Sequence, residues 1–248
     1  MGILVSTNNL TKCYGSTKAL DNINLNLESG HIYGLLGPNG SGKTTFIKLL
    51  NGLLTPTSGQ ITFEQKPIGA SSKAAISYLP DQTYLDDYLK VRDFIAMFKH
   101  FYSDFDEQRA LELFYILGID ITTKFKALSK GNKEKVQLVL VMSRRAKLYV
   151  LDEPIAGVDP AARDFILKVI LDNYDSAASI LICTHLIADI ENILDHAIFI
   201  NKGTIFKDIS VNEIKQKGMT VDEYFREEFK ISDPIMRRYM SATEGGNN

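Results

Sequence analysis

The sequence has few cysteines and gives no sign of a disulfide framework. Cys13 and Cys183 are the two cysteines among 248 residues, and no hydrophobic leader precedes them. Small secreted domains that depend on disulfides carry cysteine at a much higher density. We therefore expect both side chains to be free thiols in a reducing compartment, each packed as a small hydrophobic group.

The sequence also lacks a long apolar run and an excess of charge of either sign. The apolar stretch at residues 136–142 is interrupted by Gln137 and is far shorter than the roughly 20 residues that span a bilayer. The formal net charge is −2, and lysine and arginine are spread along the whole chain. No basic surface for nucleic acid or for an anionic membrane is therefore indicated. Any membrane that this protein serves must be crossed by another chain.

Strands and helices are predicted to alternate along the chain, whose 45% hydrophobic content is sufficient for a core. Short apolar runs bounded by turn residues predict strands, and a helical period predicts helices within residues 91–121. The predicted strands are residues 3–5, 23–27, 32–36, 60–63, 148–151 and 180–183. Further helices are expected from about Asn132, after Asp159-Pro160, and as two short helices beyond Ser210. This alternation favours an α/β fold with a parallel sheet.

The strongest local motif is Gly37-Pro38-Asn39-Gly40-Ser41-Gly42-Lys43-Thr44, which has the P-loop spacing and lies between a predicted strand and a helical run. Glycines in such a loop let backbone N–H groups turn towards phosphate oxygens, and the following helix adds the positive end of its dipole. Lys43 would pair with the β and γ phosphates, and the Thr44 hydroxyl would ligate Mg²⁺. Thr45 completes the predicted nucleotide-binding segment. A glycine-rich turn without function is the alternative, which the flanking strand and helix disfavour.

Three predicted strands run directly into polar residues. The residues that follow these strands are Gly37, Asp152, Glu153 and His185. Because ligands bind at the carboxyl edge of an open parallel sheet, these side chains are expected to converge on one site. Asp152 is expected to hold Mg²⁺ through its water shell, opposite Thr44, and Glu153 to polarise the attacking water.

With these residues, the sequence resembles the nucleotide-binding subunit of ABC transporters over roughly residues 3–208. Besides the P-loop, the matching positions are Tyr14, Leu128-Ser129-Lys130-Gly131-Asn132, Asp152, Glu153, Asp159 and His185. The resemblance implies an α/β fold: a RecA-like P-loop NTPase core with a parallel sheet, an N-terminal antiparallel β subdomain and an inserted helical subdomain at about residues 84–140. The nucleotide-binding domain would span residues 1–210, followed by a helical tail at 211–248 with a frayed end.

The resemblance also implies roles for residues outside the P-loop. Tyr14 would stack on adenine, and Asp159 would lie in the loop that crosses a dimer interface. Ser129, Lys130 and Gly131 begin a helix whose positive end would face ATP held by the P-loop of a second subunit.

Three residues are the candidate catalytic groups of this family mechanism, namely Lys43, Glu153 and His185, the last of which would contact the γ phosphate. Two ATP molecules would hold two subunits head to tail. Hydrolysis would remove the γ phosphate that both subunits bind, so the dimer would loosen.

The implied cofactors are ATP and Mg²⁺, and the implied partners are a second nucleotide-binding subunit, from the same or a related chain, and a transmembrane permease on a separate chain. The protein would be cytoplasmic and peripheral on the inner face of the cell membrane. The chain is similar to bacterial subunits that export antibiotics or amphipathic antimicrobial and toxin-like peptides. The similarity lies in the family signature at residues 128–132, which here reads Leu-Ser-Lys-Gly-Asn, in the basic residues Lys133 and Lys135 that follow it, and in residues 222–225. A soluble ABC ATPase that acts on ribosomes or nucleic acid is the alternative, which the charge and the organisation of the chain disfavour.

The sequence departs from the family pattern at several positions. Asp81 occupies the usual position of a magnesium-contacting glutamine, and Gln82 follows one residue later, so either side chain can take that role. An ionised Asp81 can coordinate Mg²⁺ or accept a hydrogen bond from water, but it cannot donate a hydrogen bond. In the family signature at residues 128–132, Lys130 replaces glycine and Asn132 replaces glutamine. The Lys130 side chain can face the nucleotide or the solvent. Ala156 replaces a serine before the interface loop.

The remaining candidates are expected to be structural. His31, His100 and His196 have no metal-site spacing, so surface or loop positions are favoured. Acidic residues at 86–87 and at 104–106 are expected to cap helices. The aromatic stripe at residues 94, 98, 101 and 105 is expected to be mainly core, although an exposed member could contact the transporter.

Overall fold

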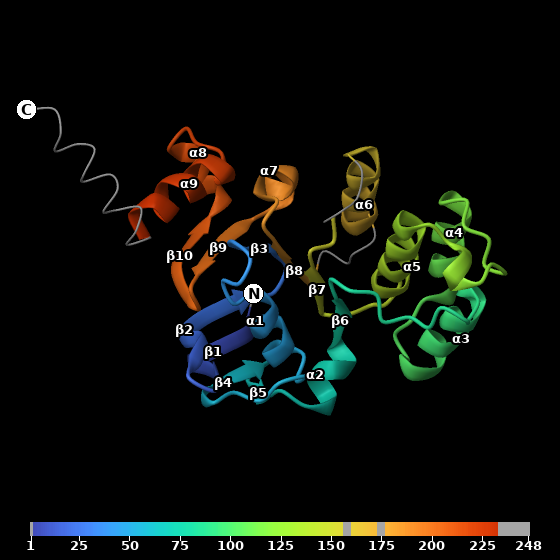
Figure 1. Cartoon of the computed structure of the whole chain (residues 1–248), viewed down its shortest axis with the longest axis horizontal. Coiled ribbons are helices and arrows are strands. Elements are labelled where there is room, and N and C mark those ends of the chain that lie inside the picture. Colours follow the sequence, from blue (N-terminus) through green and yellow to red (C-terminus); the bar gives the residue numbers. More distant parts are fainter. Residues whose placement is uncertain (1, 156–159, 173–176, 233–248) are drawn as a thin grey trace, which may run out of the picture.

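The computed structural model describes residues 2–155, 160–172 and 177–232, and these form two sheets with surrounding helices (Figure 1). One sheet has four strands in the order β2-β1-β4-β5, and the other has six in the order β10-β9-β3-β8-β7-β6. Within the described residues, the structure has no helix that is long and apolar enough to cross a membrane.

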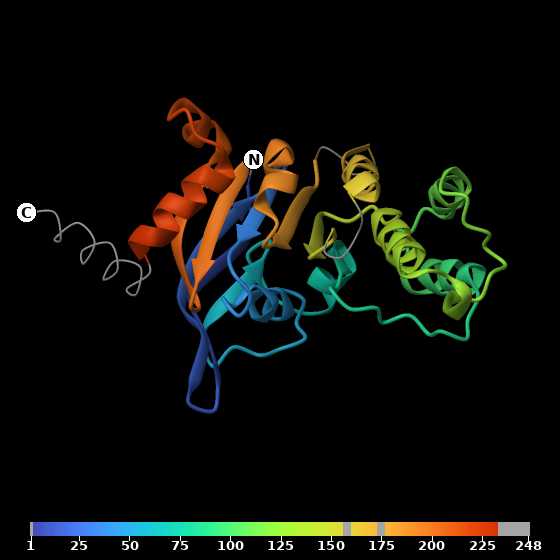
Figure 2. The same cartoon turned by 45° about the horizontal axis from the view of Figure 1, so that its top comes forward.

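The four-stranded sheet is antiparallel and comes from the N-terminal part of the chain. Its strands are β1 (Ile3–Tyr14), β2 (Thr17–Glu28), β4 (Ser58–Phe63) and β5 (Lys66–Pro67). The hairpin of β1 and β2 extends away from the body of the molecule (Figure 2). β1 is much longer than the predicted strand at residues 3–5 because it pairs with β2 on one side and β4 on the other. These two ladders keep its polar residues extended.

The six-stranded sheet is parallel except for its edge strand β10. Its strands are β3 (Ile32–Leu36), β6 (Ile76–Leu79), β7 (Leu148–Asp152), β8 (Ser179–Thr184), β9 (His196–Asn201) and β10 (Thr204–Ser210). β8 pairs with β3 on one side and with β7 on the other. The three strands that lead into the P-loop, the two carboxylates and His185 are therefore neighbours in the sheet.

The parallel sheet is buried on both faces. Along β3, Ile32 and Leu36 pack into one core cluster, and Tyr33 and Leu35 pack into the other. The second cluster lies between the two sheets and includes Phe46 of α1 (Lys43–Leu50). Parallel strands covered on both sides are nearly continuous in hydrophobic residues, which is the pattern that made these strands predictable.

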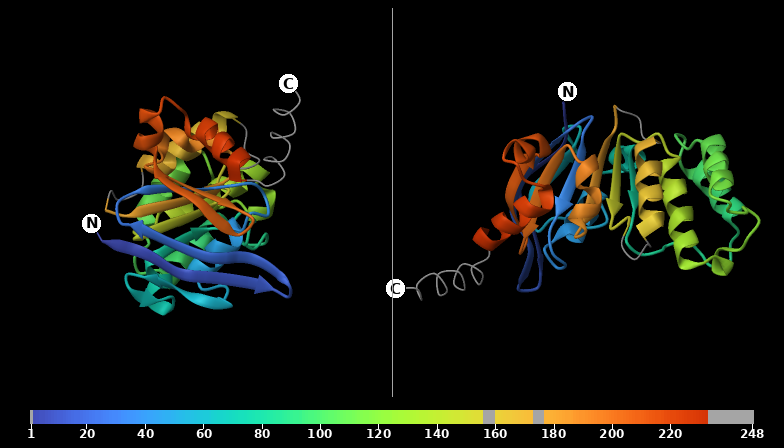
Figure 3. Two further views of the ribbon diagram at one scale, coloured as in Figure 1. Left: turned by 90° about the vertical axis from the view of Figure 1, so that its left-hand side faces the viewer. Right: turned by 90° about the horizontal axis from the view of Figure 1, so that it is seen from above.

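A helical segment lies at one end of the parallel sheet, beyond β6 (Figure 3). Its helices are α3 (Val91–Phe101), α4 (Glu107–Ile116), the 3-10 helix η1 (Phe125–Ala127) and α5 (Lys130–Met142), and the short α2 (Ala70–Ala75) precedes β6. Phe94 and Phe98 are buried here, but Phe101 is 71% exposed. The aromatic stripe is therefore only partly core. α5 begins two residues before the predicted Asn132.

Arg144, between α5 and β7, joins this segment to the sheet. Its guanidinium makes two 3.0 Å hydrogen bonds to the Asp104 carboxylate and donates to the carbonyls of Ile76, at 2.6 Å, and Ala74. The same group stacks on Tyr102, 3.9 Å from the ring centroid. Arg144 is 2% exposed, so these contacts are made largely out of water.

The remaining helices follow β7 and the final strands. They are α6 (Pro160–Asp172), α7 (Ile187–Ile190), the 3-10 helix η2 (Glu191–Ile193), α8 (Val211–Gln216) and α9 (Val221–Ser232). The two short helices predicted beyond Ser210 are present as α8 and α9. Phe225 of α9 packs edge-on against Phe199 of β9, with centroids 5.2 Å apart. The predicted frayed end lies outside the described residues.

Most of the predicted helix caps are wrong. The Asp106 side chain caps α4 by accepting a hydrogen bond from the Arg109 backbone N–H, as predicted. Asp86 instead accepts from the Tyr88 backbone in a turn, and Asp87 and Asp104 form ion pairs with basic side chains distant in sequence. An aspartate can thus form an ion pair with a lysine or arginine far away in the sequence, and the spacing of the residues does not predict such a pair.

Candidate active site

The P-loop connects β3 to α1 in a turn that needs its glycines. Gly40 and Gly42 have φ angles of +78° and +114°, which favour glycine. A Cβ atom at Gly37 would lie 2.2 Å from the Ile200 carbonyl oxygen, so the loop passes directly against β9. The Gly203 backbone N–H donates to the Ser41 carbonyl at 2.8 Å, which fixes the loop from the β9–β10 turn.

Lys43 begins α1, and its ammonium group folds back over the loop. The Nζ atom donates to the carbonyls of Gly37, at 2.7 Å, and Pro38, at 3.2 Å, and it lies 3.9 Å from Glu153 Oε1. Lys43 is 6% exposed. The loop, the dipole of α1 and this ammonium together form a positive concave surface that suits phosphate.

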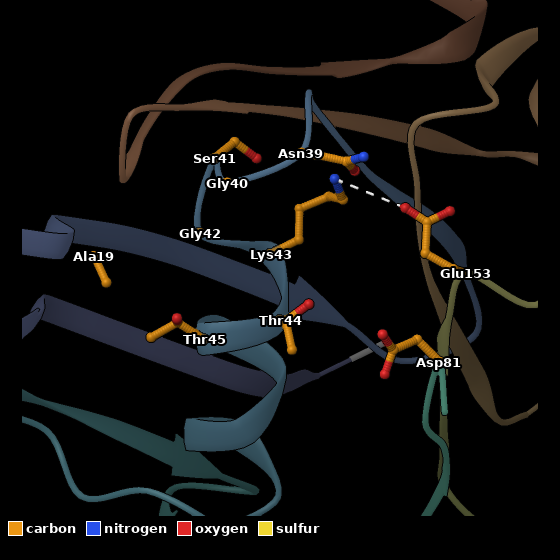
Figure 4. A pocket seen from close by; sticks show the side chains of 10 residues that line it. All are labelled: Ala19, Asn39, Gly40, Ser41, Gly42, Lys43, Thr44, Thr45, Asp81 and Glu153. Atoms are coloured by element: carbon orange, nitrogen blue, oxygen red, sulfur yellow. Dashed lines mark ion pairs between the residues drawn. The ribbon is translucent and has the colours of Figure 1, made fainter. Parts of the chain in front are cut away.

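A cavity of about 230 Å³ opens over the loop (Figure 4). It is lined by Ala19, Asn39, Gly40, Ser41, Gly42, Lys43, Thr44, Thr45, Asp81 and Glu153. In Figure 4, Asp81 and Glu153 face the P-loop from the opposite side of the cavity. Gly37 and Pro38 line an adjoining space of about 260 Å³ together with His185.

Asp152 ends β7 as a buried carboxylate, 1% exposed. Neither carboxylate oxygen has a hydrogen-bond partner among the described residues. Burial, reinforced by the negative charge of Asp81, raises the pKa of Asp152 to about 6, and the nearby Thr44 hydroxyl and Lys43 partly oppose the rise. Unpaired carboxylate oxygens beside a hydroxyl and a second carboxylate form an oxygen-only set, which fits a hard cation such as Mg²⁺.

Glu153 is held in an unusual backbone conformation, with a φ angle of +50°. Its N–H donates to the Cys183 carbonyl at 2.7 Å, and its carboxylate accepts a 2.8 Å hydrogen bond from the Thr184 hydroxyl. His185 Nδ1 lies 2.8 Å from Glu153 Oε1. A strained residue with a fixed carboxylate at a sheet edge is typical of a functional position, and this one is placed to polarise a water molecule.

Asp81 and Gln82 differ in their position relative to the cavity. Asp81 lines it and is close enough to Asp152 to affect the pKa of that carboxyl group. Gln82 is exposed and is not among the ten lining residues. Of the two candidates for the magnesium-contacting position, the geometry favours Asp81.

Five other predicted site residues lie away from this cavity or outside the described chain. Tyr14 ends β1 and is 49% exposed, next to the tip of the hairpin. Ser129, which caps α5, and Lys130 are exposed, and the Lys130 ammonium lies 3.9 Å from Glu134. Gly131 is half-buried, with open space where a Cβ would lie. Asp159 lies outside the described residues.

The structure adds residues that the sequence did not indicate. Thr184 holds Glu153 by its hydroxyl group, and Ala19 of β2 lines the cavity. Glu134 and Gln137, both on α5, face Asp152 across a small chamber. A polar residue inside the apolar run at 136–142 is the signal that could have identified Gln137.

The histidines outside the site lie at structural positions. Within the described parts of the chain, no three histidine, cysteine or acidic side chains are grouped as a metal ion would require. His31 and His196 pack against each other edge to face, with ring centroids 5.2 Å apart. These two histidines belong to the packing at the opposite end of β3 and β9.

Comparisons with known proteins identify the family. A family model described as "ABC transporter" matches residues 20–156. The ABC transporter ATP-binding protein YtrB of Bacillus subtilis is 31% identical over 225 residues, which cover 90% of this chain and 77% of that protein. The SkfA peptide export ATP-binding protein SkfE of Bacillus subtilis is 29% identical, covering 90% and 96%, and the bacitracin transport ATP-binding protein BcrA of Bacillus licheniformis is 29% identical, covering 94% and 76%.

Solved structures give the same result. The structure of an ATP-binding subunit of an ABC transporter superposes with a TM-score of 0.80 at 25% identity, covering 90% of this chain and 98% of that one. A dimeric ATP-binding cassette in a post-hydrolysis state with ADP and Pi has the same fold, with a TM-score of 0.74 at 21% identity, covering 84% and 98%. The chain therefore belongs to the ABC transporter family and is an ATP-binding domain with ATPase activity.

Proposed function

We propose that the P-loop cavity binds ATP with Mg²⁺ and that the edge of the parallel sheet hydrolyses it. Lys43 would leave the carbonyls that it now contacts and pair with the β and γ phosphates. Thr44 would ligate Mg²⁺, with Asp152 acting through the water shell of the ion and Asp81 contributing from the other side. The unpaired oxygens of Asp152 are the observation that supports this arrangement.

Glu153 is the proposed group that polarises the attacking water, and His185 is the proposed contact of the γ phosphate. The 2.8 Å contact between Glu153 and His185 supports a common role. Hydrolysis would release the γ phosphate that lies beside Glu153 and His185. The contacts of both side chains would then change, which would couple hydrolysis to the conformation of this sheet edge. Lys43, Glu153 and His185 are thus the proposed catalytic residues.

The active form is proposed to be a head-to-tail dimer of two such subunits. Ser129, Lys130 and Gly131 at the start of α5 are exposed or half-buried and lie away from the P-loop cavity of their own chain. In the dimer they would face ATP on the second subunit, where the helix dipole favours negative charge. Tyr14 would then cover the adenine ring.

ATP hydrolysis by this dimer is proposed to drive a transmembrane permease on a separate chain, at the cytoplasmic face of the membrane. Relatives named for bacitracin transport and for export of a peptide support export of a drug or an amphipathic peptide. YtrB, BcrA and SkfE are named for transport or export rather than for ribosomes or nucleic acid, so they do not support the alternative of a soluble ABC ATPase.

The proposal rests on one observation, the convergence of Lys43, Asp152, Glu153 and His185 at a single sheet edge. The test is Glu153→Gln, which keeps the shape of the side chain but removes its charge. We expect phosphate release to fall about 10²–10⁴-fold, the range for loss of a general base, while Mg·ATP is retained and dimers accumulate. The dimer is measured by light scattering with Mg·ATP and, as a control, with ADP.

The membrane partner is tested with the same variant. Tagged Glu153→Gln protein is recovered from gently solubilised native membranes in Mg·ATP, and the copurifying proteins are identified. A stoichiometric multi-helix membrane protein is the expected result. Recovery with ribosomes or DNA, or only in the soluble fraction, would contradict the transport role, and failure of wild-type protein to release phosphate would contradict the proposed hydrolysis.

A further inference from the structure

A small chamber lies between α5 and the end of β7, next to the P-loop cavity. It has a volume of about 30 Å³ and is lined by Leu79, Pro80, Asp81, Glu134, Gln137, Asp152, Glu153 and Pro154. Asp81 and Glu153 line both spaces. The chamber is therefore continuous with the site where ATP and Mg²⁺ are proposed to bind.

The chamber is surrounded by hydrogen-bond acceptors that lack partners. Gln137 is 4% exposed and Asp152 is 1% exposed. Glu134 Oε2, Gln137 Oε1 and both carboxylate oxygens of Asp152 are buried without a hydrogen bond from any described residue. A buried polar atom left unpaired costs about 1–3 kcal/mol. Four such atoms around one space indicate that a donor from outside the chain satisfies them.

The orientation of Gln137 follows from its other contact. Its Nε2 atom lies 3.5 Å from the Lys133 carbonyl oxygen, one helical turn earlier. Turning the amide over would place its oxygen against that carbonyl oxygen, so the observed orientation is preferred. Oε1 is therefore the atom presented to the chamber.

The elements on the two sides of the chamber are held by the core. The Ser77 hydroxyl of β6 donates to the Val141 carbonyl of α5 at 2.9 Å. β6 in turn pairs with β7 through a parallel ladder that includes Leu79 and Leu151. Because α5 and β7 are both attached to β6, the space between Gln137 and Asp152 has a defined size.

The contents of the chamber are restricted by its volume and by its lining. A space of about 10–15 Å³ is enough for one water molecule, so this one has room for about two, one of which can lie between Gln137 and Asp152. A water molecule has two hydrogens, and it can donate one to Gln137 Oε1 and the other to Asp152.

We propose that Gln137 is a positioning residue for Asp152, acting through a single water molecule that bridges Gln137 Oε1 and the Asp152 carboxylate. This inference rests on the proposed function, since it concerns the carboxylate that is proposed to hold Mg²⁺. Ser129 caps the start of α5, so the bridge links the helix that would face the partner's nucleotide to the magnesium-binding edge of its own chain.

The test compares Gln137→Met with wild type in the full-length purified chain. Methionine has a similar volume but no oxygen. The binding of a fluorescent ATP analogue is measured with Mg²⁺ and with EDTA. We expect wild type to gain affinity from Mg²⁺ and Gln137→Met to lose about 3–10-fold of that gain, the equivalent of one lost hydrogen bond. Its affinity in EDTA should equal that of wild type.

Ser143→Ala is the matched control. Ser143 is fully buried at the other end of α5, and its hydroxyl oxygen is also unpaired among the described residues, but it does not line the chamber. This variant should bind the analogue as wild type does in both conditions. A Gln137→Met chain that keeps the whole Mg²⁺ gain, or loses affinity equally in EDTA, would overturn the positioning role.

A high-resolution crystal structure of the wild-type chain provides a second test that needs no variant. Density for a water molecule within hydrogen-bond distance of both Gln137 Oε1 and Asp152 is the expected result, and a dry chamber would overturn the proposal. If wild type gained no ATP affinity from Mg²⁺, the proposed function would be contradicted instead, and the crystal structure would still decide the bridge.

Discussion

Replacing the buried Arg144 by methionine should destabilise the protein far more than replacing the exposed Arg145 next to it. The guanidinium pairs with Asp104 through two hydrogen bonds of 3.0 Å and also donates to two backbone carbonyls. Methionine fills part of the space but leaves Asp104 and both carbonyls without these donors. The side chain of Arg144 is 3% exposed, whereas that of Asp104 is 24% exposed.

The magnitude follows from these contacts. Breaking a buried ion pair by removing one partner typically costs about 3–5 kcal/mol. Because water can reach part of the Asp104 carboxylate, we expect a value near the lower limit, about 3 kcal/mol. Whole domains are stable by only about 5–15 kcal/mol, so the variant should unfold at a clearly lower urea concentration. Arg144→Lys keeps the charge but not the paired N–H donors of the guanidinium, so its free energy of unfolding should lie between those of wild type and Arg144→Met.

The assay is urea unfolding followed by circular dichroism, with the free energy of unfolding from linear extrapolation. Arg145→Met is the control: its side chain is 75% exposed and makes a 2.9 Å ion pair with Asp106. Exposed pairs of this kind contribute about 0–1 kcal/mol. A loss for Arg144→Met no larger than for Arg145→Met would refute the idea that Arg144 fixes the helical segment to the sheet.

Three further predictions concern the P-loop and the magnesium edge. Gly37→Ala should abolish binding of a fluorescent ATP analogue and lower the melting temperature, because its Cβ would lie 2.2 Å from the Ile200 carbonyl oxygen; an unchanged melting temperature would contradict this contact. Lys43→Ala should weaken Mg·ATP binding about 10–100-fold, as expected for loss of a charged hydrogen bond, and calorimetry should measure it. Burial raises the pKa of Asp152 to about 6, so the protonated carboxyl stabilises the chain fully below the unfolded pKa, and this contribution is lost as the pH rises from about 4 to 6. Mg²⁺ needs the ionised carboxylate, which is the main form of Asp152 at pH 7.5 but not at pH 5. Thermal unfolding should show Mg·ATP stabilising the chain more at pH 7.5 than at pH 5, and equal stabilisation at both values would argue against a cation beside Asp152.

The convergence of the site could be predicted because it depends on local patterns. A strand, a glycine-rich turn and a helix define the P-loop, and Asp152 and His185 each follow a run of buried strand residues. In an open parallel sheet, the carboxyl ends of strands share one edge. The order of the strands was not needed for that prediction, although it brings β3, β8 and β7 into contact.

Other features could not be predicted because they depend on contacts between distant segments. Arg144 and Asp104 are 40 positions apart, and neither has a pattern that identifies the other. Gln137 interrupts an apolar run, which marks it in the sequence, but the residues that it faces are fixed only once α5 packs on β6. The predicted caps at residues 86–87 were wrong for the same reason, since Asp87 pairs with Lys133 of α5.

The strand order also has a consequence for biosynthesis. β3 is made early, but its two neighbours in the sheet, β8 and β9, leave the ribosome about 150 residues later. Gly30, just before β3, bonds to the Ser179 hydroxyl 149 positions later, and at about 5–20 residues per second that interval lasts roughly 7–30 s. The P-loop, which rests against Ile200, cannot acquire its final support before then. A nascent chain is thus unable to bind nucleotide tightly until synthesis has passed Ile200.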